Sequence, residues 1–192
     1  MDADPQTPVS YEEAKGVIGG IFGAAKAVVQ AVKERFDYET LDNNPPETSP
    51  SNETSVVQLG IFEEGTVLLT ADAGPVGLAE AAIYANSLGL LTAPTCIQVP
   101  HHGSRRNVTP SVLKLWLGMP LNNPNQTRGS AYCSVGKNKT EHPRKKVKNA
   151  FIRRGYPVHV TRTQIKTHFM GWGLRPGWVT SQPEPFSADV ED

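Results

Sequence analysis

Apolar positions in the first part of the chain recur with helical spacing, at Val17, Ile21, Val28 and Val32 among others. Such a stripe is typical of one face of an amphipathic helix. Ser10 and Glu13 precede it with the spacing of a capping box, in which a hydroxyl and a carboxylate satisfy unpaired backbone amides. We therefore predict an amphipathic helix within residues 1–40 that begins near Ser10 and buries its apolar face by packing.

A second pattern, made of short apolar runs, begins near residue 55. Runs at 55–62 and 66–72 are joined by Glu63-Glu64-Gly65, which indicates a β-hairpin. The remaining runs predict strands at 96–100, 130–136 and 157–163 and helices at 77–89, 109–118 and 142–155. Because strands and helices alternate, we predict an α/β layer with parallel crossovers.

The composition suggests a compact core between segments that have little to pack. Apolar residues make up 38% of the 192-residue chain, which also holds 17 Gly and 16 Pro. Residues 41–54 are rich in Pro, Ser, Asn and Glu and predict a linker, and residues 174–192 predict a disordered tail. The packed domain is expected to span residues 55–173.

The zero net charge hides a difference between the two halves of the chain. Residues 1–100 hold 14 acidic and 4 basic side chains, whereas residues 101–192 hold 15 basic and 5 acidic ones. The basic half suits an anionic substrate, or simply balances the acidic half. Cys96 and Cys133 lie in apolar runs and predict buried thiols in a reducing compartment. With no signal-peptide pattern, we expect a cytoplasmic protein with no membrane partner.

Side chains that bind metals follow three of the predicted strands. Asp72 ends the first hairpin, His101 and His102 follow the next strand, and His142 comes shortly after the strand beyond. In sheets of this kind chemistry gathers at the carboxyl ends of the strands. A carboxylate and imidazoles suit Zn²⁺, Mn²⁺ or Fe. Taken singly, each of these residues is equally typical of a helix or strand cap.

Four segments occur in an order that resembles the second half of a metallo-β-lactamase-fold hydrolase. They are N-x-x-S-V-V from residue 52, L-L-T-A-D-A from 68, V-P-H-H-G-S from 99 and S-V-G-x-N-x-x-x-H-P from 134. The chain is most similar to the branch that contains the hydrolase domain of the DNA-uptake protein ComEC. The resemblance implies the C-terminal half of an αββα sandwich, and a metal-dependent hydrolase.

The resemblance also implies roles for individual residues. Asp72 would bridge two metal ions, Zn²⁺ or Mn²⁺, with His142, His101 and His102 as further ligands. Asp72, His101 and His102 would form the catalytic centre. Residues implied to contact the substrate are Asn52, Gly103, Ser104, Arg105, Arg106 and Lys137. Asn52 stands where many relatives carry a histidine ligand, and the amides around Gly103 would face an oxyanion.

One part of the family pattern is absent from the sequence. No H-x-H-x-D-H loop occurs, and no histidine precedes residue 52. In the family this loop supplies most ligands of the first metal and half of those of the second. We therefore expect a partial or truncated form that binds metal weakly or not at all by itself. Another polypeptide would carry the missing N-terminal half.

Basic residues surround the same loops, at Arg105, Arg106, Lys137, Lys139, Arg144, Lys145, Lys146 and Lys148. They favour a phosphodiester, such as a nucleic acid or nucleotide, although a solvated helix face would have the same composition. Arg153 and Arg154 are expected to complement the dipole of the last helix. Two alternatives to an enzyme remain, a non-catalytic nucleic-acid-binding half-fold and a degenerate structural remnant.

Overall fold

The computed structural model describes residues 34–162, 164–171, 173 and 175–191. The predicted N-terminal helix falls outside these residues, apart from its last few positions. Residues 34–40 are described, and they contain a turn at residues 36–37 and no helix.

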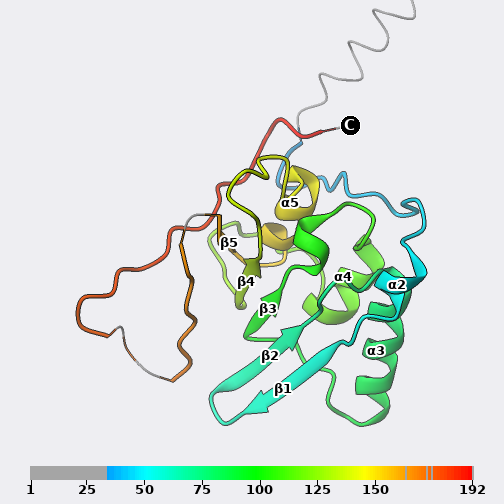
Figure 1. Cartoon of the computed structure of the whole chain (residues 1–192), viewed down its shortest axis with the longest axis horizontal. Helices are drawn as coiled ribbons and strands as arrows, with labels where there is room; N and C mark the ends of the chain where they lie inside the picture. Colours follow the sequence, from blue (N-terminus) through cyan, green and yellow to red (C-terminus); the bar gives the residue numbers. More distant parts are fainter. Residues whose placement is uncertain (1–33, 163, 172, 174, 192) are drawn as a thin grey trace, which may run out of the picture. The chain divides into compact units, whose positions relative to one another are not determined.

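The described chain is built on one five-stranded mixed sheet (Figure 1). Its strands lie in chain order: β1 (Gln58–Phe62), β2 (Gly65–Leu69), β3 (Cys96–Gln98), β4 (Ser130–Cys133) and β5 (Val158–Val160). β1 and β2 form an antiparallel hairpin, and the later pairs are parallel. The predicted α/β fold with its hairpin and parallel crossovers is thus confirmed.

Four α-helices occur in the described residues: α2 (Pro50–Glu53), α3 (Pro75–Ser87), α4 (Pro110–Leu117) and α5 (Lys145–Arg153). A short 3₁₀ turn, η1 (Pro100–Gly103), follows β3. Because successive parallel strands are neighbours, right-handed crossovers place α3, α4 and α5 on the same face of the sheet. Trp116 of α4 ties two of these helices together by donating its indole N–H to the carbonyl of Leu78, 3.0 Å away.

Side chains alternate between the two faces of the sheet. Leu68, Ile97, Ala131 and Val158 are paired in register across β2–β5 and are all at most 2% exposed. They form the core beneath the helices. Since successive strand residues point to opposite faces, Gln98, Tyr132 and His159 are presented on the other face, again in register. The side away from the helices is therefore polar and aromatic.

The C-terminal segment is ordered from residue 184 to 191, in place of the predicted disordered tail. Nδ2 of Asn149 in α5 donates to the Ser187 carbonyl at 2.7 Å. The amides of Lys145 and Lys146 donate to the Glu191 carboxylate at 3.0 and 3.3 Å. Helix α5 has no capping side chain at its own first position. The tail supplies acceptors for amides that would otherwise lack partners.

The predicted linker, residues 41–54, also packs. Ser49 caps α2, and the Glu53 carboxylate accepts from the amide of Gly77 at 2.8 Å. Leu41 is 4% exposed and belongs to the core. The polar composition of this segment therefore reflects capping rather than disorder. No helix among the described residues is long and apolar enough to cross a membrane.

Candidate functional site

The loops after β2 and β3 meet through strained backbone. Ala71, His101 and His102 have φ angles of 46°, 43° and 57°, in the left-handed region that costs a non-glycine residue about 1 kcal/mol. The His101 amide donates to the Ala71 carbonyl at 3.0 Å. Asp72 therefore lies at the same edge of the sheet as the histidine pair, as the strand order predicts.

Asn52 lies next to His101. Nδ2 of Asn52 is 2.8 Å from Nδ1 of His101. Since an amide nitrogen donates, Nδ1 accepts, and the neutral ring carries its proton on Nε2. His101 thus has a fixed N–H donor on the side of the ring away from Asn52.

His102 has the opposite arrangement. Its Nδ1 donates to the Ser134 carbonyl at 2.6 Å, which leaves Nε2 as the acceptor in the neutral ring. The ring centroids of His101 and His102 are 5.7 Å apart with an interplanar angle of 76°. A backbone carbonyl on Nδ1 is the usual means of orienting the Nε2 lone pair of a metal ligand or a base. His101 therefore offers an N–H donor at its Nε2, and His102 offers an acceptor at its Nε2.

Gly103 docks the histidine turn onto the loop that carries His142. The Gly103 carbonyl accepts from the Arg144 amide at 2.9 Å. A Cβ at Gly103 would stand 2.4 Å from Cβ of Pro143, so no other residue fits here without a shift of the backbone. The close approach brings His102 and His142 to the same small pocket.

This pocket has a volume of about 200 Å³ and is lined by His102, Val135, Gly136, Lys139, Glu141 and His142. Nδ1 of His142 is buried and has no hydrogen-bond partner among the described residues. Burial lowers the pKa of His142 from its ordinary value of 6.5, the positive charge of Arg144 lowers it further, and the Glu141 carboxylate partly opposes the shift. His142 is therefore neutral near pH 7 and keeps a free lone pair.

Asn107 and Ser134 belong to the site although neither was among the predicted site residues. Asn107 is 1% exposed, and its Nδ2 donates to the carbonyls of Asp72 at 2.9 Å and Ala73 at 3.3 Å. It fixes the backbone of the Asp72 loop, whereas Ser134 acts on His102 through its main chain. Backbone contacts of this kind leave little trace in residue type. Ser134 could have been found only as the first residue of the S-V-G motif.

The four predicted metal ligands lie on loops at one edge of the sheet, where His102 and His142 share a pocket and Asp72 follows Ala71, whose carbonyl binds the His101 amide. Across the residues that the structure describes, no three His, Cys, Asp or Glu side chains are arranged to hold an ion. His102 and His142 supply two suitable nitrogens, whereas structural and catalytic zinc sites use at least three protein ligands. The described side chains are therefore one ligand short of such a site.

The basic residues divide into an inward and an outward set. Arg153 and Arg154 are each 1% exposed and bind the carboxylates of Glu34 and Glu39 at 2.5 and 2.6 Å. The two arginines therefore form ion pairs inside the protein. The sequence predicts a different role for them, complementation of the dipole of the last helix. Lys148 is 6% exposed and donates to Ser187 Oγ at 2.8 Å, so it is withdrawn from any substrate.

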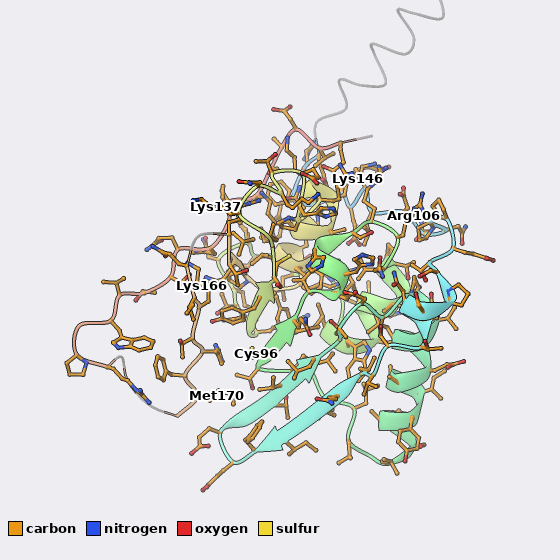
Figure 2. All side chains as sticks on the ribbon, viewed as in Figure 1. Cys96, Arg106, Lys137, Lys146, Lys166 and Met170 are labelled. Carbon is orange, nitrogen blue, oxygen red and sulfur yellow. The ribbon has the colours of Figure 1, made fainter. Side chains whose placement is uncertain are left out.

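The outward set lies on the loops around the histidines. Arg106 and Lys137 are exposed, and Figure 2 places them, with Lys146, in the half of the view toward which β2 and β3 point. Lys139 is 3.9 Å from the Glu141 carboxylate, which offsets part of its charge. The candidate site thus keeps a positive rim that is smaller than the sequence suggested.

The two cysteines are free and buried, as predicted. Burial raises the pKa of Cys96 to about 11 and that of Cys133 to about 12. Both therefore remain protonated near neutral pH and take no part in chemistry that needs a thiolate.

Comparison of the chain with protein-family models, with curated proteins and with solved structures found no match in any of the three.

Proposed function

We propose that the chain is the C-terminal half of a metallo-β-lactamase-fold hydrolase of the ComEC-like branch. The observation that carries the proposal is the meeting of three loops at one sheet edge. The His101 amide binds the Ala71 carbonyl, Asn52 binds the His101 ring, and His102 shares a pocket with His142. A site of this kind would act on a phosphodiester or another anionic substrate.

The layering of the fold supports the same proposal. An αββα sandwich has two sheets packed face to face, with helices on the outside only. The described residues form one sheet, with helices on one face by the crossover rule, and with Phe62 of β1 and Leu69 of β2 exposed at 55% and 44% on the other. A second polypeptide that carries the missing half would cover the part of that face formed by β1 and β2.

The residues present have distinct chemical capacities. Nε2 of His102 and Nδ1 of His142, which has no hydrogen-bond partner among the described residues, would serve as ligands or as a base when they carry the lone pair. The Nε2–H of His101 is a donor suited to an oxyanion. Arg106 and Lys137 would attract an anionic substrate. Since a third ligand is lacking in the described chain, metal chemistry here requires the partner, and we derive no step through a metal.

Titration of the purified chain with Zn²⁺ by calorimetry tests the proposal. We expect weak binding that His102→Ala and His142→Ala each reduce further, because each removes one of two free nitrogens. His159→Ala is the matched control, since it removes an imidazole from the face away from the helices. Equal Zn²⁺ affinity in all four proteins would overturn the proposal.

The alternative of a nucleic-acid-binding half-fold without catalysis predicts a different result. Such a protein would bind DNA or RNA without metal, and its affinity would fall steeply with salt. The inward orientation of Lys148, Arg153 and Arg154 weakens this alternative, since these charges cannot reach a phosphate. Buried free thiols favour a cytoplasmic protein.

A further inference from the structure

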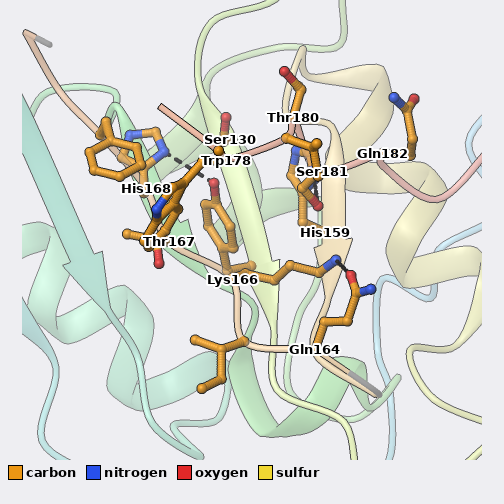
Figure 3. Close-up of a pocket in the computed structure, with 15 residues that line it drawn as sticks. Ser130, His159, Gln164, Lys166, Thr167, His168, Trp178, Thr180, Ser181 and Gln182 are labelled. Carbon is orange, nitrogen blue, oxygen red and sulfur yellow. Dashed lines mark hydrogen bonds between the residues drawn. The ribbon is translucent and has the colours of Figure 1, made fainter. Parts of the chain in front are cut away.

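A second and larger pocket lies on the sheet face away from the helices, beneath a covering segment made of residues 164–169 and 177–182. Its volume is about 820 Å³. Figure 3 shows side chains of β4, β5 and this covering segment surrounding it. None of the residues of the histidine site lines it, so it is separate from the site described above.

The floor of the pocket is a pair of stacked rings held by hydrogen bonds. Tyr132 and His159, in register on β4 and β5, have ring centroids 5.3 Å apart and planes inclined by 21°. The Tyr132 hydroxyl lies 3.2 Å from Nδ1 of His168, and Nδ1 of His159 lies 3.0 Å from Ser181 Oγ. Both contacts tie the covering segment to the sheet. The floor is therefore flat, aromatic and fixed in position.

The wall of the pocket is aromatic as well. Phe169 and Trp178 contact each other edge to face, with centroids 5.5 Å apart. The Arg175 guanidinium stands 5.3 Å from the Phe169 ring centre and 5.8 Å from that of Trp178. Trp178 remains 46% exposed, although burial of an indole is favourable. A partly exposed ring beside a cavity is the usual platform for a planar ligand.

Lys166 is the one charged side chain among the fifteen that line the pocket, and the lining includes no Asp or Glu. The Nε2 atom of His168 is buried without a hydrogen-bond partner in the described chain. Burial lowers the pKa of both His159 and His168, so these two rings add polar atoms but no charge near pH 7. The positive potential of the interior therefore comes from Lys166, and no acidic side chain of the lining offsets it.

We propose that this pocket binds a small planar aromatic anion of the nucleoside monophosphate class. The ring would lie on the floor formed by Tyr132 and His159, against Trp178 of the wall, and the phosphate would meet Lys166. Lys166 is partly buried, and its ammonium group donates to the side-chain carbonyl of Gln164 at 3.3 Å. An anionic oxygen is a stronger acceptor than this neutral amide. The inference does not depend on the hydrolase proposal.

Calorimetric titration of the full chain with adenosine 5′-monophosphate, adenosine and inorganic phosphate tests the assignment. We expect the monophosphate to bind more tightly than either part alone. Lys166→Gln should weaken monophosphate binding about tenfold and leave adenosine unchanged, because only the phosphate contact is lost. Trp178→Ala should weaken both ligands, since stacking is common to them. Lys114→Gln, an exposed position on α4, controls for the loss of one positive charge.

Three outcomes would overturn the assignment. The first is that the wild-type chain binds no monophosphate at millimolar concentration. The second is that Lys166→Gln behaves like Lys114→Gln. The third is that His102→Ala abolishes monophosphate binding while Trp178→Ala leaves it intact, which would move the ligand to the histidine site. Thermal melting of each variant establishes that it is folded, so every result bears on the pocket.

Discussion

Nδ2 of Asn52 lies 2.8 Å from Nδ1 of His101, although the two residues are 49 positions apart in the chain. Ser49 makes the contact possible, because its hydroxyl accepts from the Asn52 amide and starts the short helix α2. A segment whose composition suggests a linker therefore sets the tautomer of a histidine in the candidate site. The side-chain amide leaves the His101 ring with its proton on Nε2.

Asn52→Asp should reverse this tautomer. A carboxylate only accepts, so Nδ1 of His101 must then carry the proton to keep the contact. Nitrogen-15 NMR of the imidazoles distinguishes the two forms directly. We expect the Nε2–H form in the wild type and the Nδ1–H form in the variant, with Asn44→Asp, on an exposed loop, resembling the wild type. The same tautomer in all three proteins would show that Asn52 does not orient the ring.

The sequence predicted those features of the fold that depend on the spacing of apolar residues and on the order of the strands along the chain. The alternation of apolar runs located all five strands, and the rule for parallel crossovers put Asp72, His101 and His142 at one edge. The sequence pattern could not predict contacts that are made through the main chain. The carbonyl of Ser134 on His102 and the amide of Arg144 on Gly103 do not depend on their side chains. Such contacts are visible only once the loops have been folded.

The composition also did not predict which charged residues are buried. The polar tail predicted disorder, and Glu34 fell within the predicted N-terminal helix, yet Glu34 and Ser187 both accept hydrogen bonds from Asn149 of α5. Arg153 donates to the carbonyls of Phe36 at 3.0 Å and Tyr38 at 2.6 Å, besides its bond to Glu34. A helix that buries an arginine must recruit acceptors from elsewhere in the chain. Periodicity alone does not identify them.

Glu34→Gln should destabilise the protein by about 3–5 kcal/mol, because it leaves the Arg153 guanidinium buried without its counter-charge. Both side chains of this pair are at most 1% exposed. Urea unfolding followed by circular dichroism measures the change. Asp37→Asn breaks the pair of Asp37 with Arg35, whose side chains are 67% and 76% exposed, and should cost less than about 1 kcal/mol. Equal losses in the two variants would contradict a structural role for the buried pair.

Stability should fall as the pH drops below 6.5. Burial lowers the pKa of His142, His159 and His168 from that ordinary value. The unfolded chain therefore takes up protons first, so the stabilisation is complete above pH 6.5 and is lost as the pH falls through the lowered values. Urea unfolding at about pH 7.5 and about pH 5.5 measures the difference. His159→Gln and His168→Gln should each make it smaller, and an unchanged difference in both would count against this origin.

Both cysteines should react slowly with a thiol reagent in the native protein. Cys133 is fully buried and Cys96 is 9% exposed, and burial raises the pKa of each thiol to about 12 and about 11. Little thiolate is therefore present at pH 8, and reagent access requires opening of the sheet. Mass spectrometry after timed labelling follows each site separately. Labelling in concentrated guanidinium chloride gives the reference rate, and native labelling at that rate would refute the predicted burial.

Glu191→Ala should destabilise the protein by about 1 kcal/mol through the loss of a helix cap. Its carboxylate accepts from the amides of Lys145 and Lys146, at the positive end of α5, where the helix has no capping side chain of its own. The core residues of α5 stay buried without it, so the variant should remain folded. Asp189→Ala removes the same charge from an exposed position of the same segment and serves as the control.

Hydrogen exchange separates this cap from a general effect of charge. The amides of Lys145 and Lys146 should exchange faster in Glu191→Ala than in Asp189→Ala, because only the first variant removes their acceptor. Urea unfolding should rank the two variants in the same order. High salt should reduce the difference without abolishing it, since screening weakens the charge–dipole attraction but leaves the hydrogen bonds. If both variants exchange and unfold alike, the tail does not cap α5, and its contacts there contribute nothing to the stability of the fold.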